Sequence, residues 1–525
     1  MEQRDFDVIV IGGGHNGLVA AGYLAQSGLK VHLIESSPTL GGATASQQIF
    51  PGVDAKLSRY SYLVSLLPDQ IVSDLKLDFQ VIKRKVASYT PTNIGGTSSD
   101  QNSDQNSDQN SDTGLLIIPN DDRANRESFQ GIGAEDDFEN WKKFYQKILQ
   151  AAPAIADTFL QPLPTLDELK AKIPEDVFQM LFEIPLGESL EKFFTNDLLR
   201  GVVLTDGLIG TFTDAFDPSL AANKCFLYHL LGNGTGEWNV PKGGMGALVD
   251  ALTHRLQELG VTFQLGARVN KISTGKVFVE GSILTTRFIV VATSPKQMAQ
   301  LQGRQAPDHL PGSQLKMNMV LKKLPELKSE IPAEIAFAGT FHFDEGFNQL
   351  QRAYQQAAAG FLPDQIPAEI YCHTLTDSSI LAPDLASQGY HTLTLFALHT
   401  PYQLFLHEGE RVKELAKDRL ISQLNSYLRE PIWEAMARDS NGEYCLEIKS
   451  PLDLERELNL PEGNIFHGDL EFPIRKSGEL LKWGSESDDP TIFLGGAGAR
   501  RGGGVSGIAG HNAAMAILEI LNLEK

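Results

Sequence analysis

The chain has 525 residues, of which 42% are hydrophobic and 21% are charged. These proportions are typical of a soluble globular protein, and a chain of this length is expected to form two or more domains. The 45 basic and 66 acidic residues give a formal net charge of −21. This negative charge argues against a nucleic-acid partner and against overall attraction to anionic lipid.

The three cysteines, Cys225, Cys372 and Cys445, are far apart in the sequence and form no CxxC pair. This spacing predicts neither a disulfide framework nor a metal site, and it favours a reducing compartment. No apolar run reaches eighteen residues, and the first predicted strand leaves no room for a signal peptide. We therefore expect a cytoplasmic protein, with peripheral contact as its route to a membrane.

The first fifty residues carry the most informative pattern. Residues 8–11 form an apolar, β-branched run that predicts a buried parallel strand, and 18–27 predict an Ala-rich helix. Gly12, Gly14 and Gly17 lie between them in the spacing GxGxxG, and a second strand at 31–34 ends at Glu35. Strand, glycine turn, helix, strand and acid together predict a dinucleotide-binding unit.

Each part of this unit has a chemical reason. The glycines allow a tight turn and close approach of a pyrophosphate, and the helix start offers unpaired N–H groups to the phosphates. Glu35 is placed to accept hydrogen bonds from a ribose diol. The Gly41-Gly42 pair allows a second stretch of backbone to approach an extended cofactor, which favours FAD over NAD.

The first long insertion begins with a predicted hairpin. Residues 89–91 and 115–119 suit two strands, and the repeat SSDQNSDQNSDQNSD at 98–112 suits a solvated, disordered loop at the tip. From 138 to 229 the apolar spacing is helical, including 190–199. The weakly polar stretch 201–216 favours packed core over a lipophilic pocket or membrane contact.

The middle of the chain returns to the dinucleotide pattern. The turn and helix of PKGGMGAL at 241–248 are followed by strand-like segments at 260–263, 268–272 and 288–293. A second insertion then predicts strands at 314–321, 369–373 and 391–399 and a helix at 410–428. These strands suit a sheet that forms the floor of a substrate cavity, with the earlier helices as its roof.

The C-terminal segment repeats the strand, glycine loop and helix of the N-terminus. A strand at 491–494 leads into the loop GGAGARRGGGVSGIAG at 495–510, and a helix is predicted at 511–523. Backbone N–H groups in such a loop can cradle anionic or polar groups. Arg500 and Arg501 in this loop, and Arg59 earlier in the chain, are the candidates for catalytic side chains. A positive charge on Arg500 or Arg501 would stabilise reduced flavin, and solvated or phosphate-facing arginines are the alternative. For Arg59, the alternative is an arginine that caps a helix or pairs with a structural acid.

These motifs in this order resemble the phytoene dehydrogenase-like flavoproteins, a branch of the superfamily with phytoene desaturases, carotenoid ketolases and amine oxidases. The resemblance implies FAD, with the backbone of Val269 against the adenine and the C-terminal loop beside the flavin. The expected cofactor-binding residues are Gly12, Gly14, His15, Asn16, Gly17, Glu35, Gly41, Gly42, Ala43, Val269, Gly498, Val505, Ser506 and Gly507.

The expected fold is α/β, with a Rossmann-like FAD-binding domain of parallel sheet and an inserted α+β substrate domain of mixed sheet and helical cap. The predicted FAD-binding parts are 1–88, 234–299 and 451–525. The predicted insertions are 89–233, which holds the hairpin and helical cap, and 300–450, which holds the substrate sheet.

The resemblance implies an FAD-dependent oxidoreductase that passes hydride between flavin N5 and a small lipophilic substrate, a carotenoid or other isoprenoid, or that assists an isomerisation. A CxxxxC disulfide is missing, and no second GxGxxG directly follows a predicted strand to bind a nicotinamide cofactor, which argues against a disulfide reductase. One alternative is an FAD-binding regulatory protein that acts through a protein partner, as some superfamily members do. A second alternative is an amine oxidase with an aromatic cage, for which Tyr60 and Trp483 are the candidates.

Overall fold

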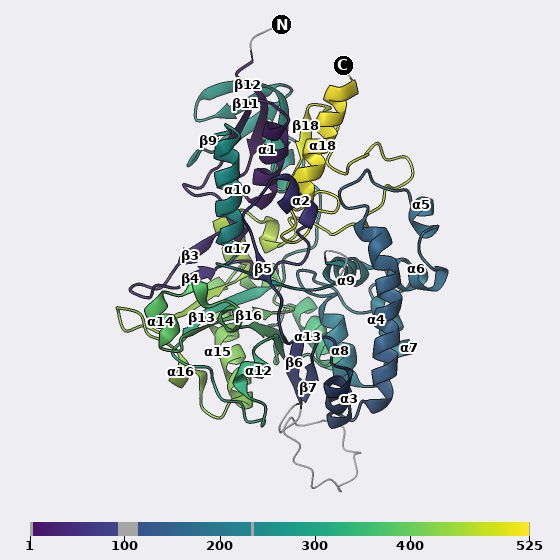
Figure 1. Cartoon of the computed structure of the whole chain (residues 1–525), viewed down its shortest axis with the longest axis vertical. Helices are drawn as coiled ribbons and strands as arrows, with labels where there is room; N and C mark the ends of the chain where they lie inside the picture. The colour runs from purple at the N-terminus through teal and green to yellow at the C-terminus, as the bar shows by residue number, and fades with distance from the viewer. Residues whose placement is uncertain (1–3, 93–113, 233–235, 524–525) are drawn as a thin grey trace.

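The structure, a computed structural model, describes residues 4–92, 114–232 and 236–523. The repeat at 98–112 lies outside these residues. The upper part of Figure 1 holds one sheet with its helices, the lower part holds a second sheet, and a group of helices lies beside both. The predicted α/β architecture with inserted mixed sheet and helices is confirmed.

The first sheet is built around β1 (Phe6–Ile11), which runs parallel to β2 (Val31–Ile34) and β12 (Ser282–Val291). Beyond them, β9 (Thr262–Gln264) pairs with β2 and β18 (Ile492–Leu494) pairs with β12, both in parallel. Val8 and Val10 pack into the core on one face of β1, and Ile9 and Ile11 pack on the other. Because both faces are covered, the strand reads as a continuous apolar run.

Two helices lie close together over this sheet, α1 (His15–Gln26) and α18 (Ile508–Leu523). A Cβ added at Gly510 would lie 1.9 Å from the carbonyl oxygen of Asn16, so only glycine allows this approach. The C-terminal helix thereby meets the N-terminal turn of the chain (Figure 1). It begins at Ile508, before the predicted start at 511, because the N–H of His511 already donates to the Gly507 carbonyl.

The second sheet has the strand order β17-β13-β16-β15-β14-β6-β7. Its apolar face carries Met317, Met319, Leu395 and Phe341, which pack with helix α15 (Gly409–Tyr427). The predicted hairpin is present as β6 (Ser88–Pro91) paired with β7 (Gly114–Ile117), and β6 joins the sheet through β14. The other strands are β13 (Leu315–Leu321), β14 (Thr340–Phe343), β15 (Ala368–Tyr371), β16 (His391–Ala397) and β17 (Leu446–Lys449).

The helical group forms its own apolar core. The predicted helical stretch at 190–199 is interrupted: Asn196 accepts a hydrogen bond from the Leu199 N–H and starts a new helix, and the carboxylate of Asp137 binds the N–H groups of Thr195 and Asn196. The helices are α3 (Asp122–Gly131), α4 (Glu135–Ala156), α5 (Leu166–Lys170), α6 (Glu175–Phe182), α7 (Leu186–Phe193), α8 (Asp197–Thr205) and α9 (Ala221–Leu231).

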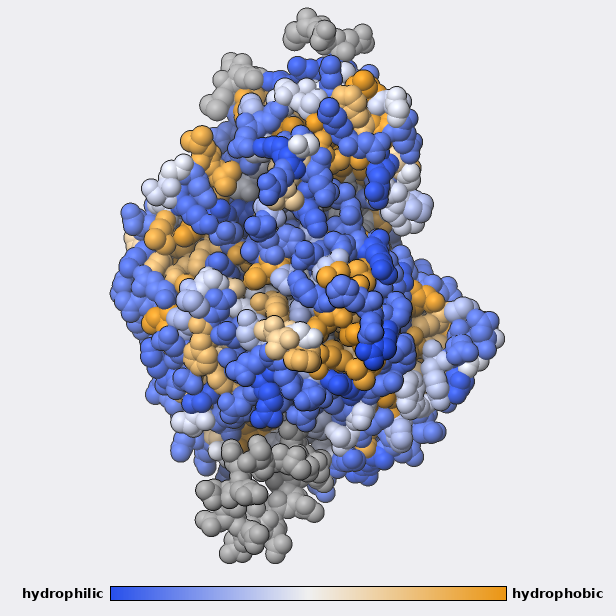
Figure 2. Space-filling model, turned by 180° about the vertical axis from the view of Figure 1, so that it is seen from behind, coloured by the Kyte–Doolittle hydropathy of each residue, from blue (hydrophilic) through white to orange (hydrophobic). Residues whose placement is uncertain are grey.

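The stretch 201–216 packs in the interior at its start, as the sequence favours. Gly201 lies against the backbone of Glu345, and the hydroxyl of Thr205 donates to the Glu345 carboxylate at 3.0 Å. Within residues 4–92, 114–232 and 236–523, no helix is long and apolar enough to cross a membrane. The rear surface in Figure 2 mixes polar and apolar side chains, and the apolar ones gather most densely near the middle of that face.

The remaining elements connect these layers. They are β3 (Ser46–Gln48), β4 (Lys56–Ser58), α2 (Asp69–Asp74), β5 (Val81–Ile82), β8 (Val240–Pro241), α10 (Gly246–Glu258), β10 (Val269–Ser273), β11 (Lys276–Val279), α11 (Pro295–Leu301), α12 (Ala333–Ala336), α13 (Phe347–Ala358), α14 (Pro383–Ser387), α16 (Ile432–Ala435) and α17 (Pro451–Leu458).

Candidate cofactor site

A cavity of about 580 Å³ opens at the carboxyl end of the first sheet. Its walls come from distant parts of the chain: the turn after β1, the end of β2, the segment before β10, the end of β12 and helix α17. Ligands of open α/β sheets bind at this edge. The predicted site residues that line the cavity are Gly12, Gly14, His15, Asn16, Glu35, Gly42, Ala43 and Val269, and the catalytic candidate Arg59 lines it as well.

Glu35 lies where the ribose of a dinucleotide is expected. One carboxylate oxygen accepts the N–H of Gly13 at 2.7 Å, and the other accepts the N–H of Ser37 at 2.7 Å. These bonds fix the carboxylate at the cavity wall. Since an ionised carboxylate has about four acceptor positions, Glu35 keeps capacity for ligand hydroxyl groups.

Four buried polar atoms in this lining have no hydrogen-bond partner. They are Nε2 of His15, Oδ1 of Asn16, Oγ1 of Thr293 and Nδ1 of His467. Buried polar atoms without partners cost about 1–3 kcal/mol each, so their concentration in one cavity marks a place for a polar ligand. The cavity therefore fits a cofactor that has many hydrogen-bonding groups along its length.

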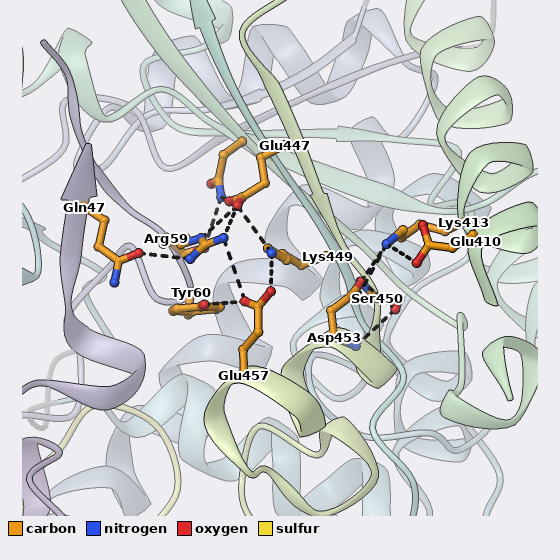
Figure 3. A network of polar contacts seen from close by, with 11 residues as sticks. Gln47, Arg59, Tyr60, Glu410, Lys413, Glu447, Lys449, Ser450, Asp453 and Glu457 are labelled. Atoms are coloured by element: carbon orange, nitrogen blue, oxygen red, sulfur yellow. Dashed lines mark hydrogen bonds and ion pairs between the residues drawn. The ribbon is translucent and has the colours of Figure 1, made fainter. Parts of the chain in front are cut away.

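Arg59 stands at the border between the cavity and the second sheet (Figure 3). Its Nε donates to the Glu447 carboxylate at 2.8 Å, and its Nη1 donates to Gln47 at 3.0 Å. The neighbouring Tyr60 donates to Glu457 at 2.5 Å, and Lys449 pairs with both glutamates. The guanidinium is thus held by structural acids, which is the alternative that the sequence left open, while the side chain also faces the cavity.

The other predicted glycines lie beside the cavity. Gly17 packs against the turn, since a Cβ there would lie 2.0 Å from the Gly12 carbonyl oxygen. The N–H of Gly41 donates to the Gly13 carbonyl at 2.8 Å, which ties the two glycine turns together. Both residues shape the lining without forming it.

The C-terminal loop also stays outside the lining, except for Ala497. The hydroxyl of Ser506 accepts the N–H of Ile508, and Gly507 lies against the apolar side chains of Val19 and Leu67. Val505 does not line the cavity. Gly498 borders a different cavity, of about 540 Å³, next to Pro295.

The two arginines of this loop bind protein groups. Arg500 donates to the Ile474 carbonyl at 2.7 Å and pairs with Glu479 at 3.0 Å. Arg501 is buried with a left-handed backbone (φ 66°), and its guanidinium donates to the carbonyls of Thr158, Gln161 and Trp483. Burial lowers the pKa of Arg501 to about 10. Neither guanidinium lines the cofactor cavity.

The tyrosine and tryptophan expected for an aromatic cage are separated. Tyr60 lines the cavity, but the indole N–H of Trp483 donates to Glu519 on α18 and its ring packs near His511. These two residues therefore do not form a cage.

Sequence reasoning missed part of the lining. The missed wall residues include Thr293, Ser294, Arg268 and His467, together with 456–460 from α17 and the residues after it. His467 was assigned no role from the sequence. Its left-handed backbone (φ 64°) brings the ring to the cavity, and no local pattern predicts that turn.

One face of the second sheet is polar although it is buried. In register across the strands, Lys316 lies opposite Lys449, Asn318 lies opposite Glu447 and Thr394, and Glu369 lies opposite His342. We call this the polar sheet face: Lys316, Asn318, Thr340, His342, Glu369, Tyr371, Thr394, Glu447 and Lys449.

Its side chains are paired with protein groups. Lys316 donates to the Ser58 carbonyl at 3.0 Å, Asn318 donates to the Arg59 carbonyl at 3.1 Å, and Tyr62 donates to Glu369 at 3.2 Å. The cavity beside Tyr62 and Tyr371, at the expected floor of a substrate cavity, measures about 20 Å³, which is room for about one water molecule.

Comparison with known proteins then defines the family. The model of the family described as flavin containing amine oxidoreductase matches residues 93–418, more than half of the chain, and an NAD(P)-binding Rossmann-like domain model matches residues 10–69. The chain belongs to the flavin containing amine oxidoreductase family. The fold, the Rossmann-like unit and the FAD that the sequence predicted are thereby confirmed, and the chain is an FAD-dependent oxidoreductase.

Three relatives and one solved structure are similar to this chain. An uncharacterized protein of Mycobacterium tuberculosis is 42% identical, over 99% of this chain and 98% of its own length. Pyridine nucleotide-disulfide oxidoreductase domain-containing protein 2 of Mus musculus is 30% identical, over 98% and 94%. Carotenoid 3,4-desaturase of Haloarcula japonica is 25% identical, over 53% and 52%. A mutant putrescine oxidase structure shares the fold at a TM-score of 0.58 and 15% identity, covering 99% of both chains.

Proposed function

We propose that the chain uses bound FAD to transfer a hydride to or from an uncharged, lipophilic organic substrate. The observation that carries the cofactor part is the group of four unpartnered polar atoms in a cavity lined by residues from both ends of the chain and its middle. When bound, FAD supplies hydride chemistry at its flavin ring. The chain's residues contribute binding, orientation and exclusion of water.

The cavity residues divide these roles by position. Glu35 would hold the ribose hydroxyls, and the N–H groups at the start of α1 would bind the phosphates. Val269 would lie against the adenine. Arg59 and Tyr60 would border the other end, where the charge network of Figure 3 keeps the wall in place.

An uncharged substrate is favoured by the state of the charges at that end. Arg59 and Lys449 are paired with Glu447 and Glu457, so no carboxylate of this network is left without a cation. A cationic amine brought there would compete with these pairs and pay its desolvation cost without a free partner. The separation of Tyr60 from Trp483 also argues against an amine cage. The partial match to a carotenoid desaturase supports a hydrocarbon-like substrate.

The test is anaerobic bleaching of the flavin absorbance of the FAD-loaded protein. We expect limonene or a carotenoid to bleach the flavin and cyclohexylamine to leave it oxidised, with dithionite as the control for full reduction. Bleaching by cyclohexylamine alone would contradict the proposal and would indicate an amine substrate. Bleaching by dithionite but by neither substrate class would favour the regulatory alternative.

A further inference from the structure

Two histidines line the cofactor cavity. His15 is the first residue of α1, and His467 lies in the loop between α17 and β18. Each has one ring nitrogen without a partner, Nε2 in His15 and Nδ1 in His467. The two rings come from opposite ends of the chain and are close enough to repel each other when charged.

The backbone groups beside the two rings define the chemistry of the unpartnered nitrogens. The backbone of Gly504, in the C-terminal glycine loop, acts to raise the pKa of His15, and the backbone of Thr293, just after β12, acts to raise the pKa of His467, so each ring has a carbonyl acceptor beside it. A neutral imidazole has a single N–H, so donating it to a carbonyl leaves the second nitrogen as an acceptor. Both unpartnered nitrogens are therefore acceptors when the rings are neutral.

Burial favours the neutral rings in the cofactor-free chain. It lowers the pKa of His15 to about 4, with help from repulsion by His467, and it lowers the pKa of His467 to about 4. The Gly504 and Thr293 bonds act in the opposite direction without offsetting burial. The other charged and titratable side chains of the lining are Glu35, Arg59, Tyr60, Arg268, Arg456 and Glu457.

The phosphate oxygens of FAD are acceptors and carry negative charge. An acceptor nitrogen cannot bond to them unless it first gains a proton, and the negative charge favours the protonated ring. We propose that His15 and His467 are cofactor-binding residues that take up a proton from solution when the anionic dinucleotide enters the cavity. The affinity for FAD then rises as the pH falls below the pKa that the pair has in the bound state.

Isothermal titration calorimetry measures this proton directly. Deflavinated full-length protein is titrated with FAD in two buffers of different ionisation enthalpy, at a pH near 6 and again near 9. The heat difference between buffers gives the protons bound per FAD. We expect an uptake approaching about one proton near pH 6, falling toward zero near pH 9, and an affinity that rises by up to about tenfold per pH unit for each proton bound.

Variants of the two histidines test whether they are the groups that bind the proton taken up with FAD. His15→Gln and His467→Gln should each reduce the uptake, whereas His254→Gln, whose side chain is 77% exposed on α10, should leave it unchanged. Far-UV circular dichroism of each variant confirms its fold, and His467→Gln, in a loop, serves if His15→Gln does not fold.

FAD binding without proton uptake near pH 6 would overturn the inference and would indicate ligand hydroxyl groups as partners. Uptake that both variants retain would also overturn it. Failure of the wild-type protein to bind FAD at all is a different result, because it would contradict the cofactor assignment itself.

Discussion

The cofactor cavity and the polar sheet face are both buried, both polar and joined through Arg59, yet they differ in how their polar atoms are satisfied. In the cavity, four side-chain atoms have no partner within a volume of about 580 Å³. On the polar sheet face, Lys316, Asn318 and Glu369 bond to protein groups, and the adjacent cavity measures about 20 Å³. Unpaired polar atoms with room beside them indicate a ligand site, whereas paired ones without room indicate structure.

Of all the changes that would test this difference between the two regions, we expect the largest effect from a substitution at the glycines of the cavity turn. In Gly17→Ala the new Cβ would lie 2.0 Å from the Gly12 carbonyl oxygen, so the turn must shift. We expect a loss of about 3 kcal/mol in the free energy of unfolding and at least about 100-fold in FAD affinity. Chemical denaturation and fluorescence titration with FAD measure the two effects.

Gly14→Ala is the matched control, because Gly14 lines the cavity and its added Cβ would lie 4.0 Å from the nearest atom. It should weaken FAD binding while the free energy of unfolding stays within about 0.5 kcal/mol of the wild type. If Gly17→Ala proved as stable as Gly14→Ala, the close packing of the turn would be disproved.

Glu35→Gln should weaken FAD binding at the ribose end. The substitution removes the charge and turns an amide N–H₂ toward the N–H of Gly13 or Ser37, which both donate to the native carboxylate. A lost charge-assisted hydrogen bond costs about 1.5–3 kcal/mol, so we expect about a tenfold to hundredfold rise in the Kd for FAD. Equilibrium dialysis checks this, and an unchanged Kd would place the ribose elsewhere.

Glu369→Gln tests the polar sheet face through its pH dependence. Burial, with repulsion from Glu345, raises the pKa of Glu369 to about 8, whereas an unfolded glutamate has a pKa of about 4.3. Between these values the folded state keeps a proton that the unfolded state loses, so this carboxyl stabilises the fold at low pH and the stability is lost as the pH rises through about 8.

The variant lacks this titration. Its free energy of unfolding relative to the wild type should therefore rise with pH inside that window, by at most about 1.4 kcal/mol per pH unit. Urea unfolding at several pH values measures the difference. A difference independent of pH would mean that Glu369 is ionised in the folded protein, and FAD affinity should change little in either case.

The smallest effect is expected in the outer part of the network in Figure 3. Glu410 pairs with Lys413 through a side chain that is 76% exposed, and Lys413 keeps its pair with Asp453 when Glu410 is changed. Glu410→Gln should alter the free energy of unfolding by less than about 0.5 kcal/mol and leave the flavin spectrum unchanged. A larger change in the free energy of unfolding or in the flavin spectrum would mean that Glu410 also belongs to the part of the network that supports the cofactor cavity.

The sequence predicted the parts of the site that depend on local pattern. The strand at 8–11, the turn from Gly12 to Gly17 and Glu35 follow one another within a single βαβ unit, so spacing alone placed them. The strand of Val269 and the hairpin of β6 and β7 were likewise recognisable from short strand-like runs.

The rest depends on contacts between distant segments. His467 reaches the cavity through a left-handed loop, and 456–460 reach it because α17 docks beside Arg59. Arg501 looked available for the cofactor in the sequence, but its guanidinium donates to three carbonyl groups from two distant segments, residues 158–161 and Trp483. The cavity beside Tyr62 and Tyr371, where the floor of a substrate cavity was expected, measures only about 20 Å³.

The central claim is that the cavity lined by Gly12 and Glu35 holds FAD. The visible spectrum of the purified protein tests this claim most directly. We predict the absorption of an oxidised flavin and, after heat release, about one FAD per chain, reduced strongly in Glu35→Gln and Gly17→Ala. A colourless wild-type protein that takes up no FAD on titration would contradict the account.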